Sequence, residues 1–260
     1  MPVRTVMVTR YVTPLREGGS LPAIVEADDD GLYVLKFRGA GQGPKALIAE
    51  FVAGEIARAL GLPVPEIVFV ELDPALARTE PDPEIQDLIR ASAGLNLALD
   101  YLPSAVMFDP VADTPDAELA SAVVWFDAYV TNVDRTPRNT NLLVWHRRLW
   151  LIDHGAALYF HHTWQDYLAR SRAPFPLIKD HVLLPRASAL READAQLAER
   201  VTPVVLASIV HRIPDAWLVG EAPFESSEQH REAYLAYLLR RLEPPRTFLE
   251  EALRARSLHL

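Results

Sequence analysis

Cysteine is absent from this chain of 260 residues. Disulfide bonds and thiolate metal sites are therefore excluded, and the composition is compatible with a reducing compartment. The chain has no window of about 18 uncharged apolar residues, so the sequence predicts no membrane-spanning helix. Residues 1–11 lack a basic region followed by a long apolar run, and no signal peptide is predicted. We therefore expect a soluble, cytoplasmic protein.

An excess of positive charge is also missing, because 26 Lys and Arg residues stand against 35 Asp and Glu residues, for a formal net charge of -9. Nucleic-acid binding is therefore not expected, and any phosphate contact should be local. The pattern Gly-x-x-x-x-Gly-Lys-Ser/Thr is absent, so a Walker-type phosphate loop is not supported. Half of the residues are apolar and 23% are charged, which indicates an ordinary folded protein with a sizeable core.

The first hundred residues predict a lobe rich in β-strands. Asp28-Asp-Asp-Gly31 is typical of a hairpin turn because Asp-Gly tolerates positive φ. A helix is expected over Pro44–Leu60, since proline suits its first turn and Gly61 its end. The strands are expected at residues 5–12 (an edge strand), 21–26, 32–37, 64–72 and 95–103.

Lys36 lies near the end of the strand at 32–37, which is apolar on both faces and is therefore expected to be buried on both sides. A buried ammonium needs a partner, unless the side chain reaches water from the strand end. On the helix at 44–60, the line through Glu50 otherwise contains the small residues Ala46, Ala53, Gly54 and Ala57. This face could lie close to the sheet, so we predict that Glu50 pairs with Lys36. Glu55 lies on the opposite side and is expected to be solvated.

The remainder of the chain predicts a mainly helical lobe. Thr114-Pro115-Asp116 is typical of a helix start, and apolar residues recur at helical spacing up to Val130. Further helices are expected to complete the second lobe and frame an acceptor groove. Their predicted ranges are 186–200, 203–213, 226–242 and 248–256.

The stretch 129–156 carries the residues with the clearest chemistry. A polar loop places Asn139 five residues after Asp134, and two apolar strands follow, the second ending at Asp153. An Asp beside an acceptor hydroxyl can act as base or orienter, and an Asn that folds back can offer an amide oxygen to Mg²⁺. Asp153 would supply the principal metal carboxylate. The alternative is a loop in which these side chains only cap turns and a strand end.

This loop resembles the Asn-x-Asp-x-x-x-x-Asn signature of HipA-like kinases. In its Asp-Arg-x-x-x-Asn form it is also similar to type II phosphatidylinositol 4-kinases. The resemblance extends over about residues 5–160 and is strongest at 132–155. Other segments that resemble short HipA-like kinase domains are Gly18-Gly19-Ser20, Tyr33-Val-Leu-Lys36-Phe, Gly43-Pro44-x-Ala-Leu-x-x-Glu50 and 96–108.

The chain departs from related kinases at three points. Asn132-Val133-Asp134 stands in place of the His-Arg-Asp of ordinary protein kinases, and Asp153-His154-Gly155 in place of Asp-Phe-Gly. Thr136 occupies the position of a histidine in many HipA-like loops. These departures mark an atypical catalytic loop and leave the substrate open.

The resemblance implies an α+β, bilobal protein-kinase-like fold. The N-terminal lobe would span residues 1–102, with an antiparallel sheet and one main helix. The C-terminal lobe would span residues 103–260, mainly helical, with the catalytic loop on a β-hairpin. ATP and Mg²⁺ are the implied cofactors.

The expected site residues follow from the same comparison. Catalytic roles are assigned to Asp134, Lys36 and Glu50, with Lys36 on the phosphates, and the metal ligands are Asn139 and Asp153. The other nucleotide-binding residues are Gly18, Gly19 and Ser20, together with Asp100, Tyr101 and Leu102, which topology places beside the adenine.

The predicted function is transfer of the γ-phosphoryl group of ATP to a hydroxyl group. The expected acceptor is a Ser or Thr side chain of a protein that is not identified. A kinase for a small molecule or a lipid headgroup is one alternative, and a pseudokinase that serves as an interaction module is another. The joint presence of the five catalytic and metal residues argues against the pseudokinase, since a lapsed kinase tends to lose one of them.

Four further residues have open interpretations. Arg135 and Arg138 flank the loop and could meet an acidic substrate or a phosphate, or could be solvated. His154 could contact the nucleotide or pack behind Asp153. Lys45 is a secondary candidate for a phosphate contact, because it stands at a predicted helix start.

Overall fold

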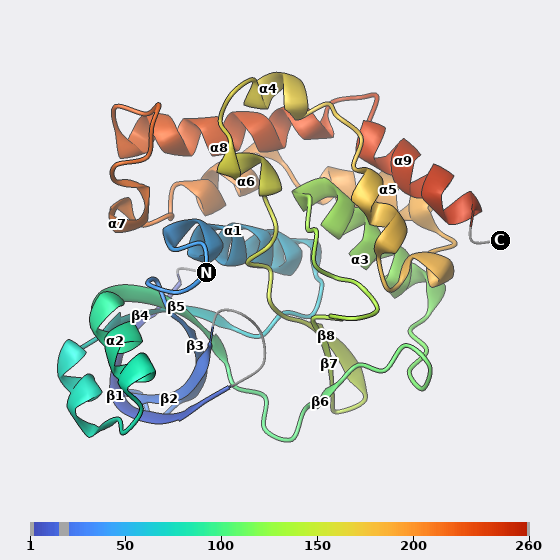
Figure 1. Ribbon diagram of the computed structural model, residues 1–260. Coiled ribbons are helices and arrows are strands. Elements are labelled where there is room, and N and C mark those ends of the chain that lie inside the picture. Colours follow the sequence, from blue (N-terminus) through green and yellow to red (C-terminus); the bar gives the residue numbers. More distant parts are fainter. Residues whose placement is uncertain (1–2, 16–20, 259–260) are drawn as a thin grey trace.

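Five strands of the N-terminal part close into a small barrel in the computed structural model, which describes residues 3–15 and 21–258. The barrel occupies the lower left of Figure 1. Its order is β1-β2-β3-β5-β4, and all neighbours are antiparallel except β1 and β4. The strands are β1 (Thr5–Pro14), β2 (Ala23–Ala27), β3 (Leu32–Lys36), β4 (Ile67–Leu72) and β5 (Gly94–Asp100).

The first strand was predicted at a sheet edge, and this prediction is wrong. β1 pairs with β2 on one side and with β4 on the other. Its pairing with β2 is irregular between Val8 and Arg10 and again between Tyr11 and Thr13. Such irregularities bend a strand and increase its twist, which allows β1 to close the barrel.

The outward face of β3 is open, so the prediction that this strand is buried on both sides is also wrong. Tyr33 and Leu35 point into the barrel and are buried, whereas Leu32 is exposed and Val34 is half-buried beside Lys36. The barrel interior takes only alternate residues of each strand, and on the outer face the described residues cover only the end at Lys36, by Glu50 and by Asp153. Barrel residues and α2 (Pro83–Ala91), which follows the 3-10 helix η1 (Pro74–Thr79), form a separate hydrophobic cluster.

Helix α1 (Pro44–Leu60) has the predicted bounds and lies between the barrel and the C-terminal helices (Figure 1). Gly61 adopts a φ of 84° and donates to two carbonyls of the last turn, which ends the helix. A Cβ atom on Gly54 would come within 2.5 Å of a side-chain carbon of Ile67 on β4. The small-residue face therefore does lie against the barrel, as its composition predicted.

The C-terminal part is mainly helical and contains one small sheet of order β6-β7-β8. The predicted hairpin is therefore joined by a third strand. Asp116 caps α3 by accepting a hydrogen bond from the Leu119 N–H, so this helix begins at Ala117. The elements are β6 (Val106–Met107), α3 (Ala117–Val130), β7 (Leu142–Trp145), β8 (Arg148–Leu151), η2 (Tyr159–His162), α4 (Tyr167–Arg170), η3 (Pro176–Asp180), η4 (Leu184–Arg186), α5 (Leu190–Arg200), α6 (Pro203–Val210), α7 (Asp215–Leu218), α8 (Ser227–Leu242) and α9 (Thr247–Ser257).

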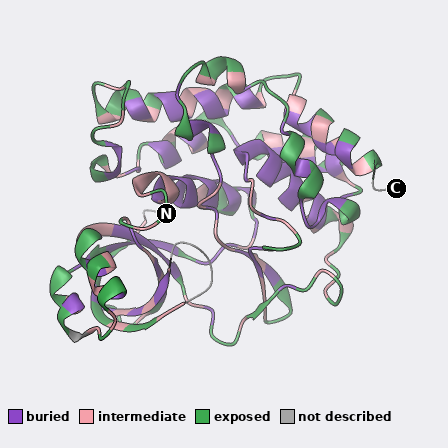
Figure 2. Ribbon diagram, in the orientation of Figure 1, coloured by how far each residue is buried: buried purple, intermediate pink, exposed green. Residues whose placement is uncertain are grey.

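One hydrophobic cluster extends from α1 through α3 and the helices of the C-terminal part, and Figure 2 shows this buried centre in purple. Polar contacts add to it. Glu55 on α1 pairs with Arg212 at 3.0 Å, and Trp217 donates from Nε1 to the Leu95 carbonyl at 3.1 Å. Glu55 is therefore not the solvated charge that the sequence predicted. The helix that carries Glu50 is held by both halves of the molecule.

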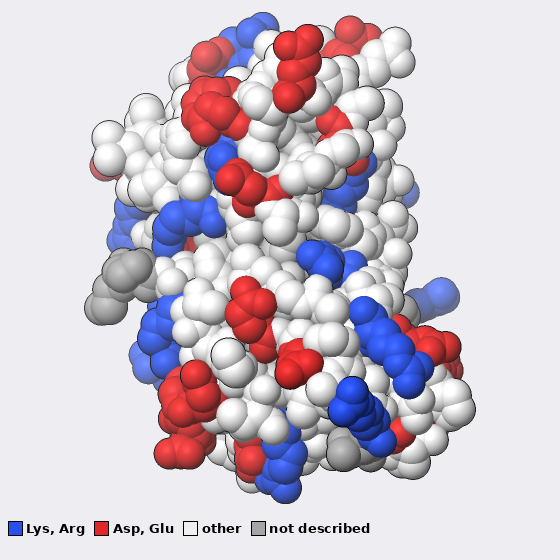
Figure 3. All heavy atoms as spheres, turned by 90° about the vertical axis from the view of Figure 1, so that its left-hand side faces the viewer, with Lys and Arg blue, Asp and Glu red and all other residues white. Residues whose placement is uncertain are grey.

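The surface shows no strong separation of charge on the face in Figure 3, where acidic and basic side chains of the described residues are interspersed. Within the described part of the chain, no helix has both the length and the apolar character needed to span a membrane.

Candidate active site

Lys36 and Glu50 meet as the sequence predicted, and Asp153 joins them. Lys36 Nζ lies 2.8 Å from Asp153 Oδ1 and 3.9 Å from Glu50 Oε2. The Lys36 side chain is 12% exposed and that of Glu50 only 2%, whereas Asp153 is 40% exposed. The alternative in which Lys36 reaches water from the strand end is therefore excluded. The shorter pair, Lys36 with Asp153, was not predicted.

The electrostatics of this cluster favour charged side chains. Burial by itself would lower the pKa of Lys36, but the carboxylates of Asp153 and Glu50 outweigh it and the net pKa is raised. Burial would raise the pKa of Glu50, but attraction by Lys36 and contact with His154 prevail and lower the pKa to about 2. The ammonium of Lys36 therefore stays charged between the two carboxylates although it is largely buried.

His154 lies behind Asp153, which was one of its two predicted interpretations. Its Nδ1 is 3.4 Å from Glu50 Oε1, its ring meets Phe126 edge-on, and the side chain is fully buried. Asp153 itself has a φ of 54°, in the left-handed region that is unfavourable for residues with a Cβ. Asp153 lies between the end of β8 and Gly155, and its carboxylate contacts Lys36.

Replacing Glu50 by Gln is expected to lower the free energy of unfolding by about 2 kcal/mol at neutral pH, because buried Lys36 and His154 both lose a charged partner. The lowered pKa of Glu50 means that its contribution is complete above the ordinary value of 4.5 and is lost as the pH falls toward about 2. Urea unfolding of both proteins should therefore show a constant difference near neutral pH that shrinks in acid. A difference that does not change with pH would contradict this assignment.

The loop predicted to be catalytic brings Asp134 and Asn139 into direct contact. Asn139 donates from Nδ2 to Asp134 Oδ2 at 2.7 Å, and Asn141 donates to the same oxygen at 3.5 Å. The backbones of Thr136 and Asn139 exchange two hydrogen bonds, which closes a turn through Pro137 and folds the chain back. In the described structure neither the Asp134 nor the Asn139 side chain accepts from a backbone N–H, so the turn-cap alternative is not supported.

Arg135 is fully buried, and both sequence interpretations of it, as a substrate contact and as a solvated charge, are wrong. Its Nε donates to Asp127 Oδ2 at 2.6 Å, and its Nη1 donates to the backbone carbonyls of Asn141 and Ile152. Because Ile152 precedes Asp153, Arg135 joins the loop that carries Asp134 to the segment that carries Asp153.

Asp127 is the centre of this buried network. Besides Arg135 it accepts a hydrogen bond from Asn132 at 2.9 Å and lies 2.8 Å from His181 Nε2. Burial would raise the pKa of Asp127, but Arg135 and His181 reverse the effect and lower it strongly. Sequence reasoning missed both Asp127 and His181. A lone acid within the apolar stripe of α3 was a signal for Asp127, whereas His181 had none.

Comparison with protein families gives a decisive match, since the family described as HipA-like kinase matches residues 8–248. The chain belongs to the HipA-like kinase family. The comparison with curated protein sequences gives no match. The predicted family and kinase class are confirmed.

One solved structure shows the same fold as this HipA-like kinase. The crystal structure of a Helicobacter pylori proinflammatory kinase, CtkA, is similar with a TM-score of 0.56 and 16% identity, over 100% of this chain and 99% of that one. The structure of the Golgi casein kinase has a TM-score of 0.48 and 12% sequence identity, over 98% of this chain and 74% of that one. The structure of the Golgi casein kinase with Mn/ADP bound has a TM-score of 0.46 and 13% sequence identity, over 95% of this chain and 74% of that one. The match to CtkA confirms the predicted α+β, bilobal kinase-like fold.

The predicted adenine residues of this HipA-like kinase lie at the end of β5 and just after it, next to the start of β3. Tyr101 donates its N–H to the Leu32 carbonyl and Asp100 to that of Glu66, while Leu102 is buried. Gly18, Gly19 and Ser20 lie outside the described residues.

Lys45, the secondary phosphate candidate, lies elsewhere. Its Nζ pairs with Glu221 at 2.7 Å, and both side chains line a cavity of about 650 Å³ beside the start of α1. The lining of this cavity does not include Lys36, Asp134 or Asp153. The residues that the structure does bring together are therefore two groups, Lys36 with Glu50 and Asp153, and Asp134 with Asn139.

Proposed function

We propose that this HipA-like kinase transfers the γ-phosphoryl group of Mg-ATP to a hydroxyl, that of a protein Ser or Thr. The observation that carries the proposal is the contact of Lys36 with both Glu50 and Asp153, because it joins a barrel strand, α1 and the hairpin of the catalytic loop. Phosphoryl transfer depends chiefly on positioning and on stabilising charge, and this arrangement supplies both.

The donor set fits a magnesium ion. Asp153 is partly exposed and uses one carboxylate oxygen for Lys36, while the amide nitrogen of Asn139 is held by Asp134, which leaves its oxygen for a ligand. Magnesium prefers such oxygen ligands together with water and phosphate. When bound, the ion would neutralise charge on the transferring phosphate.

The remaining roles belong to side chains of this chain. Lys36 would bind phosphate oxygens and keep Glu50 as its buried partner. Asp134 would orient the acceptor hydroxyl and take up its proton, while Asn139 and Asn141 hold the carboxylate in place through their amide groups. The buried network around Asp127 would keep this loop in register with the hairpin.

The test is incubation of the protein with labelled ATP and Mg²⁺, alone and with cell lysate, beside the Asp134→Ala and Asp153→Ala variants. Labelled protein bands that both variants lose support the proposal, and mass spectrometry then identifies the acceptor. Label on a small molecule or a lipid instead would favour the first alternative. Binding of ATP without transfer to any acceptor would favour the pseudokinase, and no affinity for Mg-ATP would refute nucleotide use.

The cytoplasmic location stays a prediction, as does the division of the chain into two lobes after residue 102.

Replacing Lys36 by Met is expected to lower kcat/KM for ATP by about 10²-fold or more, because a phosphate-binding charge is removed from a site that is largely shielded from water. Lys45→Met is the matched control, since Lys45 is also paired and partly buried but lies outside the cluster. It should change kcat/KM by less than about threefold. Circular dichroism would show whether both variants fold, and equal losses in the two would contradict the role of Lys36.

A further inference from the structure

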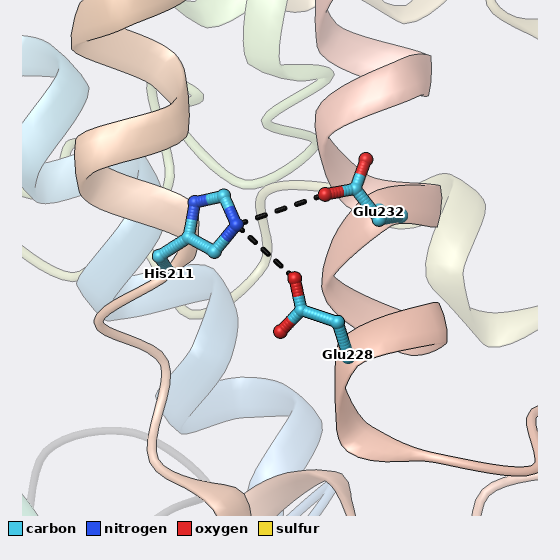
Figure 4. Close-up of side chains that lie close together, drawn as sticks. All are labelled: His211, Glu228 and Glu232. Carbon is cyan, nitrogen blue, oxygen red and sulfur yellow. Dashed lines mark hydrogen bonds and ion pairs between the residues drawn. The ribbon is translucent and has the colours of Figure 1, made fainter.

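A second group of polar side chains converges far from the catalytic cluster in the chain. Within the described residues, one set of three His and Glu side chains brings a ligand atom of each within 4.8 Å of the others. It consists of His211, just after α6, and of Glu228 and Glu232, four residues apart on α8. Figure 4 shows all three side chains pointing toward one another from the two helices. The Nε2 atom of His211 lies 3.2 Å from Glu228 Oε1 and 3.6 Å from Glu232 Oε1.

The orientation of His211 defines what this group needs. Its Nδ1 is 2.7 Å from the Ala207 carbonyl oxygen, which only accepts hydrogen bonds, so Nδ1 carries the ring hydrogen. In a neutral imidazole the lone pair of Nε2 then faces two carboxylates, an arrangement that repels. The three ligand atoms therefore converge on a point where both carboxylates would attract a cation, either a proton on Nε2 or a metal ion.

We propose that His211, Glu228 and Glu232 form a binding site for a divalent transition metal, with Zn²⁺ as its first occupant. Zinc bonds of about 2.0–2.1 Å in tetrahedral geometry place neighbouring ligand atoms roughly 3.4 Å apart, close to the two observed Nε2 to oxygen distances. Histidine ligands of metals generally donate their other ring N–H to a carbonyl or carboxylate, as His211 does to Ala207. Imidazole nitrogen favours zinc over magnesium, which takes oxygen ligands.

The surroundings fit a site with three protein ligands and solvent. The three side chains are between 44% and 61% exposed, so water completes the coordination. Arg231 lies 3.7 Å from Oε2 of Glu228, which is the oxygen that points away from His211. The two carboxylates of Glu228 and Glu232 would balance the charge of a dication. The ion would tie the end of α6 to α8. Arg212, the next residue after His211, pairs with Glu55 on α1, so the tie lies next to the contact that holds the Glu50 helix.

The test is titration of the chain, free of any histidine tag, with Zn²⁺ in excess Mg²⁺ followed by calorimetry. Magnesium occupies sites made of oxygen ligands alone. The wild-type protein is expected to bind one Zn²⁺ that His211→Ala loses and Glu232→Gln binds at least about tenfold more weakly. His162→Ala, which removes another exposed histidine, is the control and should bind as the wild type does. Zinc should raise the Tm of the wild type by about 3 °C or more and leave that of His211→Ala unchanged.

Nuclear magnetic resonance of the histidine rings separates the two possible cations. Zinc at this site shifts the ring signals of His211 before those of any other histidine. If His211→Ala binds zinc as tightly as the wild type, or if the His211 signals respond only to pH, the cation is a proton and the proposal is wrong. Neither result depends on kinase activity, so the outcome is independent of the proposed function.

Discussion

Replacing Asp134 by Asn is expected to lower kcat for phosphoryl transfer by about 10²- to 10⁴-fold and to change KM for Mg-ATP by less than about threefold. The reason is that Asp134 contacts Asn139 and Asn141 in the loop and makes no contact with Lys36 or Glu50 in the described structure. An amide at this position keeps the shape of the side chain but cannot accept the proton of the acceptor hydroxyl. Steady-state kinetics with ATP and the acceptor found in lysate would measure both constants.

Asp153 provides the contrast for this prediction. Its carboxylate is paired with Lys36 and is the metal ligand that we propose, so Asp153→Asn should raise the Mg²⁺ concentration needed for half-maximal activity as well as lower kcat. Asp87→Asn, which changes an exposed acid on α2, should have neither effect. If Asp134→Asn raised the Mg²⁺ requirement as Asp153→Asn does, the two roles would be assigned wrongly.

Replacing Asp127 by Ala is expected to lower the free energy of unfolding by about 3–5 kcal/mol, the largest stability effect that we predict. The Arg135 and His181 side chains are 0% and 2% exposed, and both lose the same carboxylate. An uncompensated guanidinium would then remain inside the protein. Asn132 would also lose an acceptor, which would loosen the loop just before Asp134.

Urea unfolding at neutral pH would measure this loss, and Asp87→Asn is again the control, with a change below about 0.5 kcal/mol. The pKa of Asp127 is lowered in the folded protein, so its contribution is present at neutral pH and is lost only as the pH falls through that lowered value in strong acid. A loss of less than about 1 kcal/mol for Asp127→Ala would show that the network around Arg135 is not a main support of the loop.

Features that depend on short stretches of sequence were predictable. The bounds of α1 followed from Pro44 and Gly61, since proline and glycine act on the backbone of their own turn. The turn that folds Asn139 back toward Asp134 followed from their spacing, although their hydrogen bond was not predicted. The pairing of Lys36 with Glu50 was also predictable, because a lysine on an apolar strand and an acid on a face of small residues each needed a partner.

Features that depend on distant segments were decided by the tertiary structure. The barrel closes because β1 bends and pairs with β4, and no local sequence pattern in either strand predicts that pairing. Arg135 reads as a loop charge until α3 supplies Asp127, and His211 reads as a surface histidine until α8 supplies Glu228 and Glu232. The sequence by itself thus determined the turns and the bounds of α1, and it carries the resemblance on which the chemistry proposed for the loop rests. Only packing decided which side chains share a proton, an ion or a buried charge. The interaction energies of such groups depend on distances of a few ångströms between residues that are far apart in the chain.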